Sequence, residues 1–197
     1  MKNFIGLMCV ISILFLTSLA GAEKIPLRVV RLPIIFQARQ PDYKTCEMLE
    51  TTIARASSIP LNGTLKLVEY IDSKESTAAL NEIWRQVQSE NKKAKLKDAI
   101  KPLAEKINAD IIICPVLHRY SEVKFQRGRF FETYLITDIS ATLIVYDRRN
   151  DELVEKKKTR SFHDSYNRFG TASYLVKDCF ERLIDATQLR QKFASIK

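Results

Sequence analysis

The residues best suited to chemistry lie in one apolar stretch, ADIIICPVLHRY, at positions 109–120. It holds Cys114 and one of the two histidines of the chain, His118. Successive residues of a strand are about 3.3 Å apart, so four residues separate these two side chains by roughly 13 Å. That distance is too long for a shared metal ion or a thiol–imidazole pair. We therefore predict that Cys114 and His118 do not form one site.

The two longest strand candidates, residues 110–126 and 130–147, assign His118 a different partner. A three-residue glycine-containing loop, 127–129, is a common hairpin connection, and it places His118 opposite Asp138. A neighbouring carboxylate raises the pKa of a histidine, so this polar cross-strand pair is a candidate pH-responsive site. An ordinary polar pair on a half-exposed sheet face is the alternative. The same register gives an apolar core face with Ile111, Ile113, Leu117, Phe125, Ile139 and Leu143.

The remaining chemistry-bearing residues are not spaced for catalysis or metal binding. In His163-Asp164-Ser165, adjacent side chains of an extended segment point to opposite sides and cannot relay a proton. The sequence has no C-x-x-C or H-E-x-x-H spacing, and Gly63, Gly128 and Gly170 are too scattered to form a phosphate-binding loop. We predict no catalytic residues, no metal site and no cofactor. A hydrolase with isolated carboxylates remains a second alternative.

Residues 1–22 have the pattern of a signal peptide. Lys2 precedes an apolar run over Phe4–Leu16, and Ala20-Gly21-Ala22 offers a cleavage site after Ala22. We predict a secreted or periplasmic protein, with an uncleaved N-terminal anchor as the alternative. Residues 23–197 then form a single domain. The longest apolar run in that part is too short to span a bilayer, which requires about 20 apolar residues.

The chain is basic, with 32 Lys and Arg against 23 Asp and Glu and a formal net charge of +9. This charge favours contact with an anionic surface, such as phospholipid or a wall polymer, although it also serves plain solubility. We predict no specific nucleic-acid binding. Cys46, Cys114 and Cys179 allow at most one disulfide, so a Cys46–Cys179 bridge and three unpaired thiols both remain open.

Two turns of the predicted sheet carry arginines, and the first is flanked by aromatic residues. The candidate partner-binding residues are Arg127, Arg129, Phe130, Phe131, Arg148 and Arg149. Aromatic and arginine side chains often dominate the binding energy of protein interfaces. The alternative is a pair of solvated loops beside a lysine-rich strand, since lysines protect sheet edges against aggregation.

Hydrophobic periodicity predicts an α+β fold. The expected strands are 27–36, 64–71, 110–126, 130–147 and a third polar strand ending near 162, and the expected helices begin after Asp42 and Asp72 and span 98–108 and 171–193. The order is β-α-β-α-α-β-β-β-α. It indicates a mixed, largely antiparallel sheet with helices covering one face.

Four segments together, RVVRLPIIF, INADIIICPVLHRY and LIVYD followed by ELV, resemble bacterial envelope proteins related to the TolB amino-terminal domain. The wider relatives are CsgG-like and penicillin-binding-protein-activator lipoproteins. This resemblance implies an α+β fold and protein–protein recruitment in the periplasm without catalysis. The chain departs from those families in lacking a well-placed lipoprotein cysteine. We therefore expect a non-enzymatic envelope protein that binds another protein, with binding of an anionic polymer or lipid headgroup as the alternative.

Overall fold

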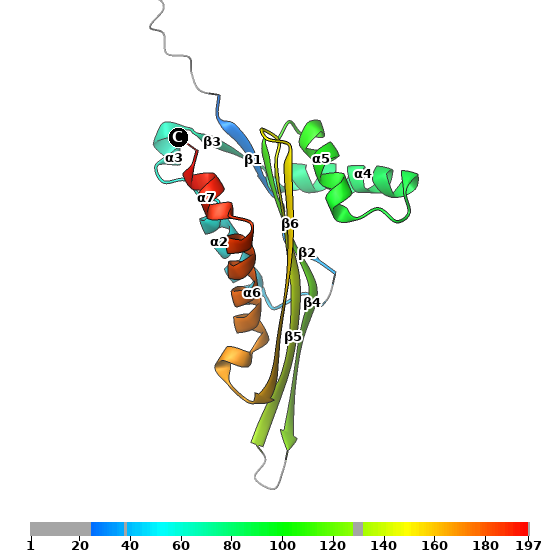
Figure 1. Cartoon of the computed structure of the whole chain (residues 1–197), viewed down its shortest axis with the longest axis vertical. Coiled ribbons are helices and arrows are strands. Elements are labelled where there is room, and N and C mark those ends of the chain that lie inside the picture. The colour runs from blue at the N-terminus through cyan, green and yellow to red at the C-terminus, as the bar shows by residue number, and fades with distance from the viewer. Residues whose placement is uncertain (1–24, 38, 128–131, 197) are drawn as a thin grey trace, which may run out of the picture.

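The computed structural model describes residues 25–37, 39–127 and 132–196. The predicted signal peptide and three of the candidate partner-binding residues, Arg129, Phe130 and Phe131, lie outside these ranges. The described chain forms one six-stranded sheet with helices packed on it (Figure 1). The predicted α+β class is confirmed, and the order of strands and helices agrees broadly with the prediction.

The sheet is mixed. Its main strands run in the order β3-β1-β4-β5-β6, and β2 pairs with β4 beside this path. Their bounds are β1 Leu27–Arg31, β2 Ile35–Phe36, β3 Val68–Ile71, β4 Ile111–Arg127, β5 Glu132–Asp147 and β6 Glu152–Ser165. Strand β1 pairs in parallel with β3 and with β4, and β2 pairs in parallel with β4. The three long strands, β4, β5 and β6, pair antiparallel. The strand expected over 27–36 is divided around Pro33, because proline has no N–H to donate to the ladder.

The bounds of the helices are α2 Tyr43–Ala56, α3 Asn62–Leu65, α4 Ser73–Glu90, α5 Leu96–Lys106, α6 Ala172–Ala186 and α7 Leu189–Ala194, with a 3-10 turn, η1, at Arg168–Gly170. Helices α2 and α4 begin directly after the predicted caps, Asp42 and Asp72, whereas the helix expected from 98 begins at Leu96 and the short helix α3 occupies the start of the strand expected over 64–71. Asp42 accepts a hydrogen bond from the backbone N–H of Thr45 (3.0 Å), and Asp72 accepts one from Lys74 (2.7 Å). Each bond satisfies an N–H that the first helical turn leaves unpaired.

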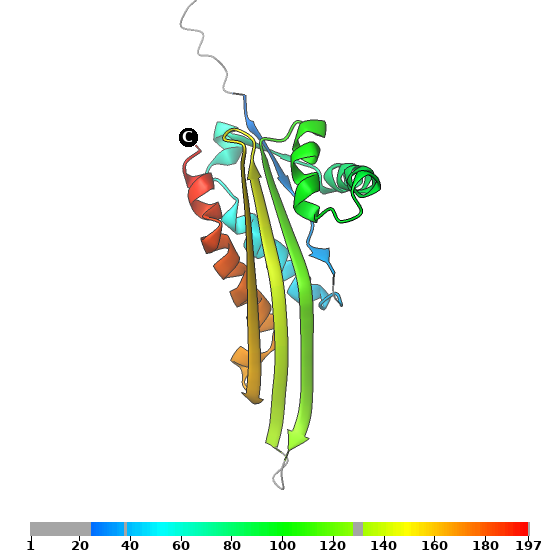
Figure 2. The same ribbon diagram turned by 45° about the vertical axis from the view of Figure 1, so that its right-hand side comes forward.

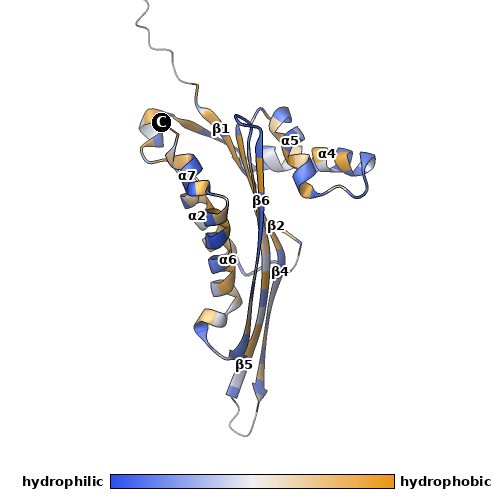
Figure 3. Cartoon of the chain, in the orientation of Figure 1, coloured by the Kyte–Doolittle hydropathy of each residue, from blue (hydrophilic) through white to orange (hydrophobic). Residues whose placement is uncertain are grey.

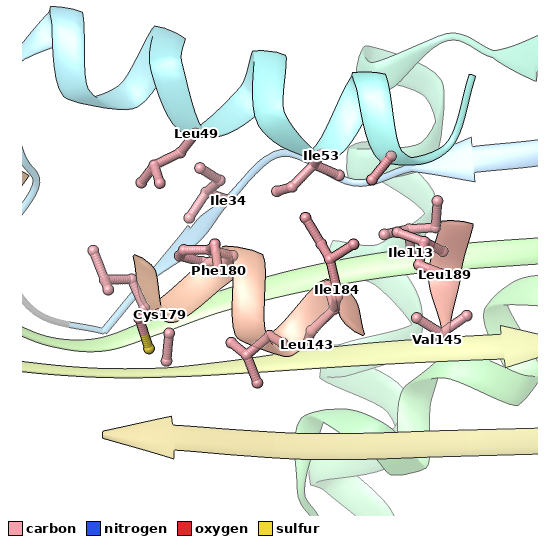
Figure 4. Packing of buried hydrophobic residues seen from close by; sticks show 14 of the residues in the cluster. Ile34, Leu49, Ile53, Ile113, Leu143, Val145, Cys179, Phe180, Ile184 and Leu189 are labelled. Atoms are coloured by element: carbon pink, nitrogen blue, oxygen red, sulfur yellow. The ribbon is translucent and has the colours of Figure 1, made fainter. Parts of the chain in front are cut away.

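One face of the sheet is covered by α2, α6 and α7 (Figures 1 and 4). All the predicted core residues from Ile111 to Leu117 and from Ile139 to Leu143 belong to this first core, together with Phe180 and Ile184 of α6. Only Phe125, which the predicted register also placed on this face, is absent from it. Helix α6 supplies most of the covering side chains because its apolar residues recur at helical spacing.

The opposite face carries a second core under α4 and α5. Its floor is formed by Ile112, Cys114 and Val116 of β4, and Leu80 of α4 and Ile100 of α5 pack on them. The sequence placed helices on one face only, whereas the structure has helices on both. Cys114 therefore faces a core and not solvent. Periodicity identifies the apolar stripe of α4 but not the face of the sheet on which it lies.

The long strands extend beyond α4 and α5 (Figure 2). We call residues 119–127 of β4 and 132–140 of β5 the distal hairpin. On the face that bears the second core, no helix of the described chain covers this hairpin (Figures 1 and 2). Hydrophilic residues predominate along the neighbouring edge strand β6 (Figure 3), whose middle holds Lys156, Lys157 and Lys158.

Candidate functional site

The predicted pairing of His118 with Asp138 is wrong. Arg127 pairs with Glu132, so residues 128–131 connect the strands in place of 127–129, and the ladder shifts between Leu117 and Arg119 at a β-bulge. Together these changes place Asp138 opposite Ser121, and His118 lies at the bulge itself. A bulge sets two residues of one strand against one of its partner, which the period of the sequence does not reveal.

His118 is held by two other side chains. Its Nδ1 lies 2.7 Å from Oε1 of Gln37, and its Nε2 lies 2.7 Å from Oγ1 of Thr142. Since Gln37 Oε1 can only accept, Nδ1–H is the donor and the Thr142 hydroxyl donates to Nε2 in the neutral ring. Partial burial, and secondarily the charge of Lys157, lower the pKa of His118. This direction is opposite to the one expected from a carboxylate partner.

Asp138 interacts with a different histidine, His163, on the neighbouring strand β6. Nε2 of His163 lies 3.7 Å from Oδ1 of Asp138, and the hydroxyl of Ser161 donates to the same oxygen at 2.7 Å. All three side chains are at least partly exposed. The pairing of β5 with β6 could have revealed this contact, because His163 is diagonal to Asp138 in that register.

A pocket of about 470 Å³ opens between α4 and the sheet, and His118 lies on its wall. Its lining comes from the β2 segment, from α4, from the start of α5 with the two residues before it, and from the strands β4, β5 and β6. Apolar side chains form much of it: Pro33, Ile35, Leu80, Trp84, Ala94, Leu96, Val116 and Ile144. Leu80 and Trp84 are four residues apart and so share one face of the helix predicted after Asp72, but this spacing gives no sign that a cavity lies beneath them.

The rim of this pocket is charged. Lys97 forms an ion pair with Glu155 (3.2 Å), and Lys95 is exposed beside it. Lys157 lies close enough to His118 to lower its pKa. The lining itself holds two lysines, Lys95 and Lys97, against Glu155, which leaves this end of the pocket with one net positive charge. Among the described residues, no group of three or more His, Cys, Asp and Glu could hold a metal ion.

The distal hairpin presents apolar side chains on its uncovered face. Val123 pairs with Ile136, and Phe125 pairs with Tyr134, whose ring lies 5.8 Å from that of Phe125 in a stacked arrangement. Val123 is 54% exposed and Phe125 39% exposed. The predicted partner-binding residues Arg129, Phe130 and Phe131 lie outside the described residues, and the described apolar side chains of the two strands were not among the sequence candidates.

The other face of the same end carries exposed aromatic residues. The rings of Phe169 and Tyr174 meet edge to face at 5.1 Å, and Lys124 lies 5.4 Å above the ring of Tyr166. Nearby, a carboxylate oxygen of Glu122 accepts a hydrogen bond from the backbone N–H of Ala172 at the start of α6 (2.6 Å). The distal hairpin is thus attached to α6 on one face and open on the other.

The second predicted arginine pair lies at the opposite end of the sheet and is engaged within the chain. Arg148 donates to Oδ1 of Asn108 (2.8 Å) and Oδ1 of Asp110 (3.1 Å). Arg149 donates two hydrogen bonds to the buried carboxylate of Asp147, at 2.9 and 2.6 Å. Burial raises the pKa of Asp147, but the bonds and charge of Arg149 outweigh it, and the net effect is a lowered pKa.

The three described cysteines are free thiols. Cys114 is fully buried, and this burial raises its pKa to about 12. Burial likewise raises the pKa of Cys179 to about 11. Cys46 is partly exposed near the start of α2. The Cys46–Cys179 bridge that the sequence left open is therefore not formed in this structure.

Comparisons with known proteins show only distant similarities. No family model and no curated protein matches the chain. Among solved structures, a hypothetical protein from Chlamydia trachomatis, CT253, has a TM-score of 0.43 with 10% identity, over 83% of this chain and 96% of the other. Lipoprotein GNA1162 from Neisseria meningitidis has a TM-score of 0.36 with 14% identity, over 81% and 99% of the two chains. The LpoB C-terminal domain from Salmonella enterica has a TM-score of 0.32 with 9% identity, over 73% and 90%.

One of these three solved structures is named a lipoprotein, but the similarities are too low to transfer a function. The sequence resemblance to the TolB amino-terminal domain and CsgG-like proteins stays a prediction. None of the helices in the described part of the chain is long and apolar enough to cross a membrane.

Proposed function

We propose that this protein is a non-enzymatic component of the bacterial cell envelope that acts by binding another protein through the distal hairpin. The observation that carries the proposal is the exposure of Val123 and Phe125 on the uncovered face of the sheet. They continue into Ile136 and Tyr134 on the next strand, so the apolar side chains are contiguous. Contiguous exposed apolar surface of this kind is typical of interaction sites.

The described charges around this surface are of both signs. Arg119 is exposed on the same face as Val123 and Phe125, and Asp138 and Glu132 lie on that face as well. An apolar centre with a charged rim matches the composition of many protein interfaces. We therefore infer a protein partner that presents an apolar patch with a polar rim.

The hydrogen bonds of His118 and Asp138 within the chain support a non-enzymatic role. Both ring nitrogens of His118 are occupied by Gln37 and Thr142, and Asp138 is engaged by Ser161 and His163. The one lone pair of the neutral His118 ring, on Nε2, already accepts from Thr142, so in this arrangement it does not face a substrate as a general base. The predicted signal peptide supports placing the protein in the periplasm or outside the cell.

The proposal is tested by affinity capture from a crosslinked bacterial envelope. We expect the wild-type chain to enrich one specific protein and the Val123→Glu variant to lose it, because a carboxylate would have to be buried in the apolar contact. Leu153→Glu is the matched control: Leu153 is a similarly exposed aliphatic residue of the sheet, 37% exposed, at the opposite end. Equal capture by all three chains would contradict the proposal.

Binding of an anionic polymer is a second candidate, favoured by the exposed lysines of β6. Such binding releases counterions and weakens steeply with salt. This candidate predicts that the protein is retained on an anionic polysaccharide column at 50 mM salt and released by 200 mM salt, roughly the range over which phosphate-dominated binding collapses. It also predicts that the double variant Lys156→Ala/Lys158→Ala is not retained. Retention unaffected by salt or by these substitutions would remove it.

A further inference from the structure

We infer that the pocket between α4 and the sheet binds an amphipathic anion, an aliphatic chain that ends in a carboxylate or phosphate. The inference concerns a site separate from the distal hairpin and does not depend on the proposed function. The pocket measures about 470 Å³. Pockets for small ligands range over about 300–1,000 Å³.

The lining favours a saturated chain. Ile35, Leu80 and Ile144 are aliphatic residues that come from three different elements and line the same cavity. Beneath them the second core is closely packed, so the wall is supported and a ligand does not have to displace it. The uncharged polar side chains of the lining are the His118–Gln37–Thr142 group, whose hydrogen bonds to His118 are already satisfied within the chain, and Thr77 and Asn81 of α4.

The rim favours a negative headgroup. Lys95 and Lys97 both line the opening, and Lys97 is the one of the two held by an ion pair, with Glu155. Lys95 is exposed, so its ammonium group is available to a ligand. A neutral His118 adds no competing charge. The ligand that matches this opening therefore carries one anionic group at the end of an apolar chain.

Trp84 makes the inference directly measurable, because it is the sole tryptophan of the chain and lines the pocket. We propose titrating the protein, purified from the envelope of an expressing host, with hexanoate, octanoate, decanoate and dodecanoate below their micelle concentrations. Trp84 fluorescence should change saturably. Affinity should rise about fourfold per methylene, as expected for transfer of a CH₂ group out of water, until the pocket is full.

Two substitutions distinguish the contribution of the ligand's anionic headgroup from that of its aliphatic chain. Lys95→Glu should weaken dodecanoate binding at least fivefold and leave dodecanol binding unchanged, whereas Lys93→Glu, an exposed lysine of the same segment outside the pocket lining, should change neither. Leu96→Asp should abolish binding of both ligands, with Leu153→Asp as the matched control. Circular dichroism establishes that each variant is folded.

A further arm identifies the source of the ligand. Co-sedimentation with phosphatidylglycerol vesicles that is lost in Leu96→Asp would assign the site to membrane lipid. Saturable dodecanoate binding without co-sedimentation would assign it to a free fatty acid or similar amphiphile. Unchanged Trp84 fluorescence with every chain length, or affinity independent of chain length, would overturn the inference.

Discussion

Leu117 and Tyr120 of β4 both pack against the first core, although they are three positions apart along the strand. In a regular strand, side chains three positions apart point to opposite faces. The bulge at His118 accounts for the exception, because it adds one residue to β4 and none to β5. Beyond it, Val123 and Phe125 face away from the first core. Without the bulge they would lie on the side of α6.

The bulge also explains the surroundings of His118 and leads to a prediction about pH. The pKa of His118 is lowered in the folded chain from the ordinary histidine value of 6.5. As pH falls toward and below 6.5, the unfolded chain therefore binds more protons at this histidine than the folded chain does. Stability should therefore fall as pH decreases from 7.5 through 6.5 toward the folded pKa. His118→Gln removes this titration, so the variant should lose less stability than the wild type between pH 7.5 and 5.5.

Urea unfolding of the two chains at a series of pH values measures this difference. The comparison cancels the contributions of all other titrating groups that the substitution leaves unchanged. Parallel pH profiles for wild type and His118→Gln would show that the fold imposes no shift on this histidine.

The first core depends on Phe180, which is fully buried in α6. Phe180→Ala should reduce the free energy of unfolding by about 3–5 kcal/mol, as is usual for removing a buried phenylalanine ring. Phe169→Ala is the control, because Phe169 is 49% exposed, and it should cost about 1 kcal/mol or less. Chemical denaturation of both variants checks the pair, and similar losses would contradict the assignment of the core to this face.

Arg149 should prove structural and not a partner contact. Arg149→Ala leaves the buried carboxylate of Asp147 without two hydrogen bonds, which should destabilise the chain by about 1–3 kcal/mol at pH 7. Because Arg149 lowers the pKa of Asp147, its stabilising effect is present above the ordinary value of 3.8 and is lost as pH falls below it. Denaturation at pH 7 and pH 3 measures this loss. A variant as stable as the wild type but unable to capture the partner would assign Arg149 to the interface.

The three thiols of the described residues should differ in reactivity. The thiolate is the reactive form, and the raised pKa values of Cys114 and Cys179 keep both protonated at pH 8. Iodoacetamide should modify Cys46 in the native protein and the other two only in denaturant, as located by peptide mass spectrometry. Rapid labelling of native Cys114 would mean that the second core opens readily.

The core face could be predicted from the sequence even though the register was wrong. The predicted register placed Ile111 opposite Val145, and the structure places it opposite Asp147, two residues further. A shift of two residues keeps every side chain on its face, because side chains alternate with a period of two. The identity of Ile111, Ile113 and Leu117 as core residues is therefore insensitive to this error.

The candidate site could not be predicted in the same way. The partner of His118 depends on the exact register and on the bulge, neither of which periodicity encodes. The predicted core position of Phe125 failed for the same reason. The pocket could not be predicted from the sequence because its lining comes from segments as far apart as Ile35 and Ile144. Only the tertiary packing of α4 brings these segments together.

The central claim, that the distal hairpin binds a protein through its uncovered face, is tested most directly by site-specific photocrosslinking in living cells. A photoreactive phenylalanine analogue is placed at Val123, and in a second chain at Lys177, an exposed position of α6 away from that face. We predict a single crosslinked product of defined mass from position 123 that is absent from position 177 and contains a different protein. No product at 123, the same products from both positions, or a product containing only a second copy of this chain would contradict the account.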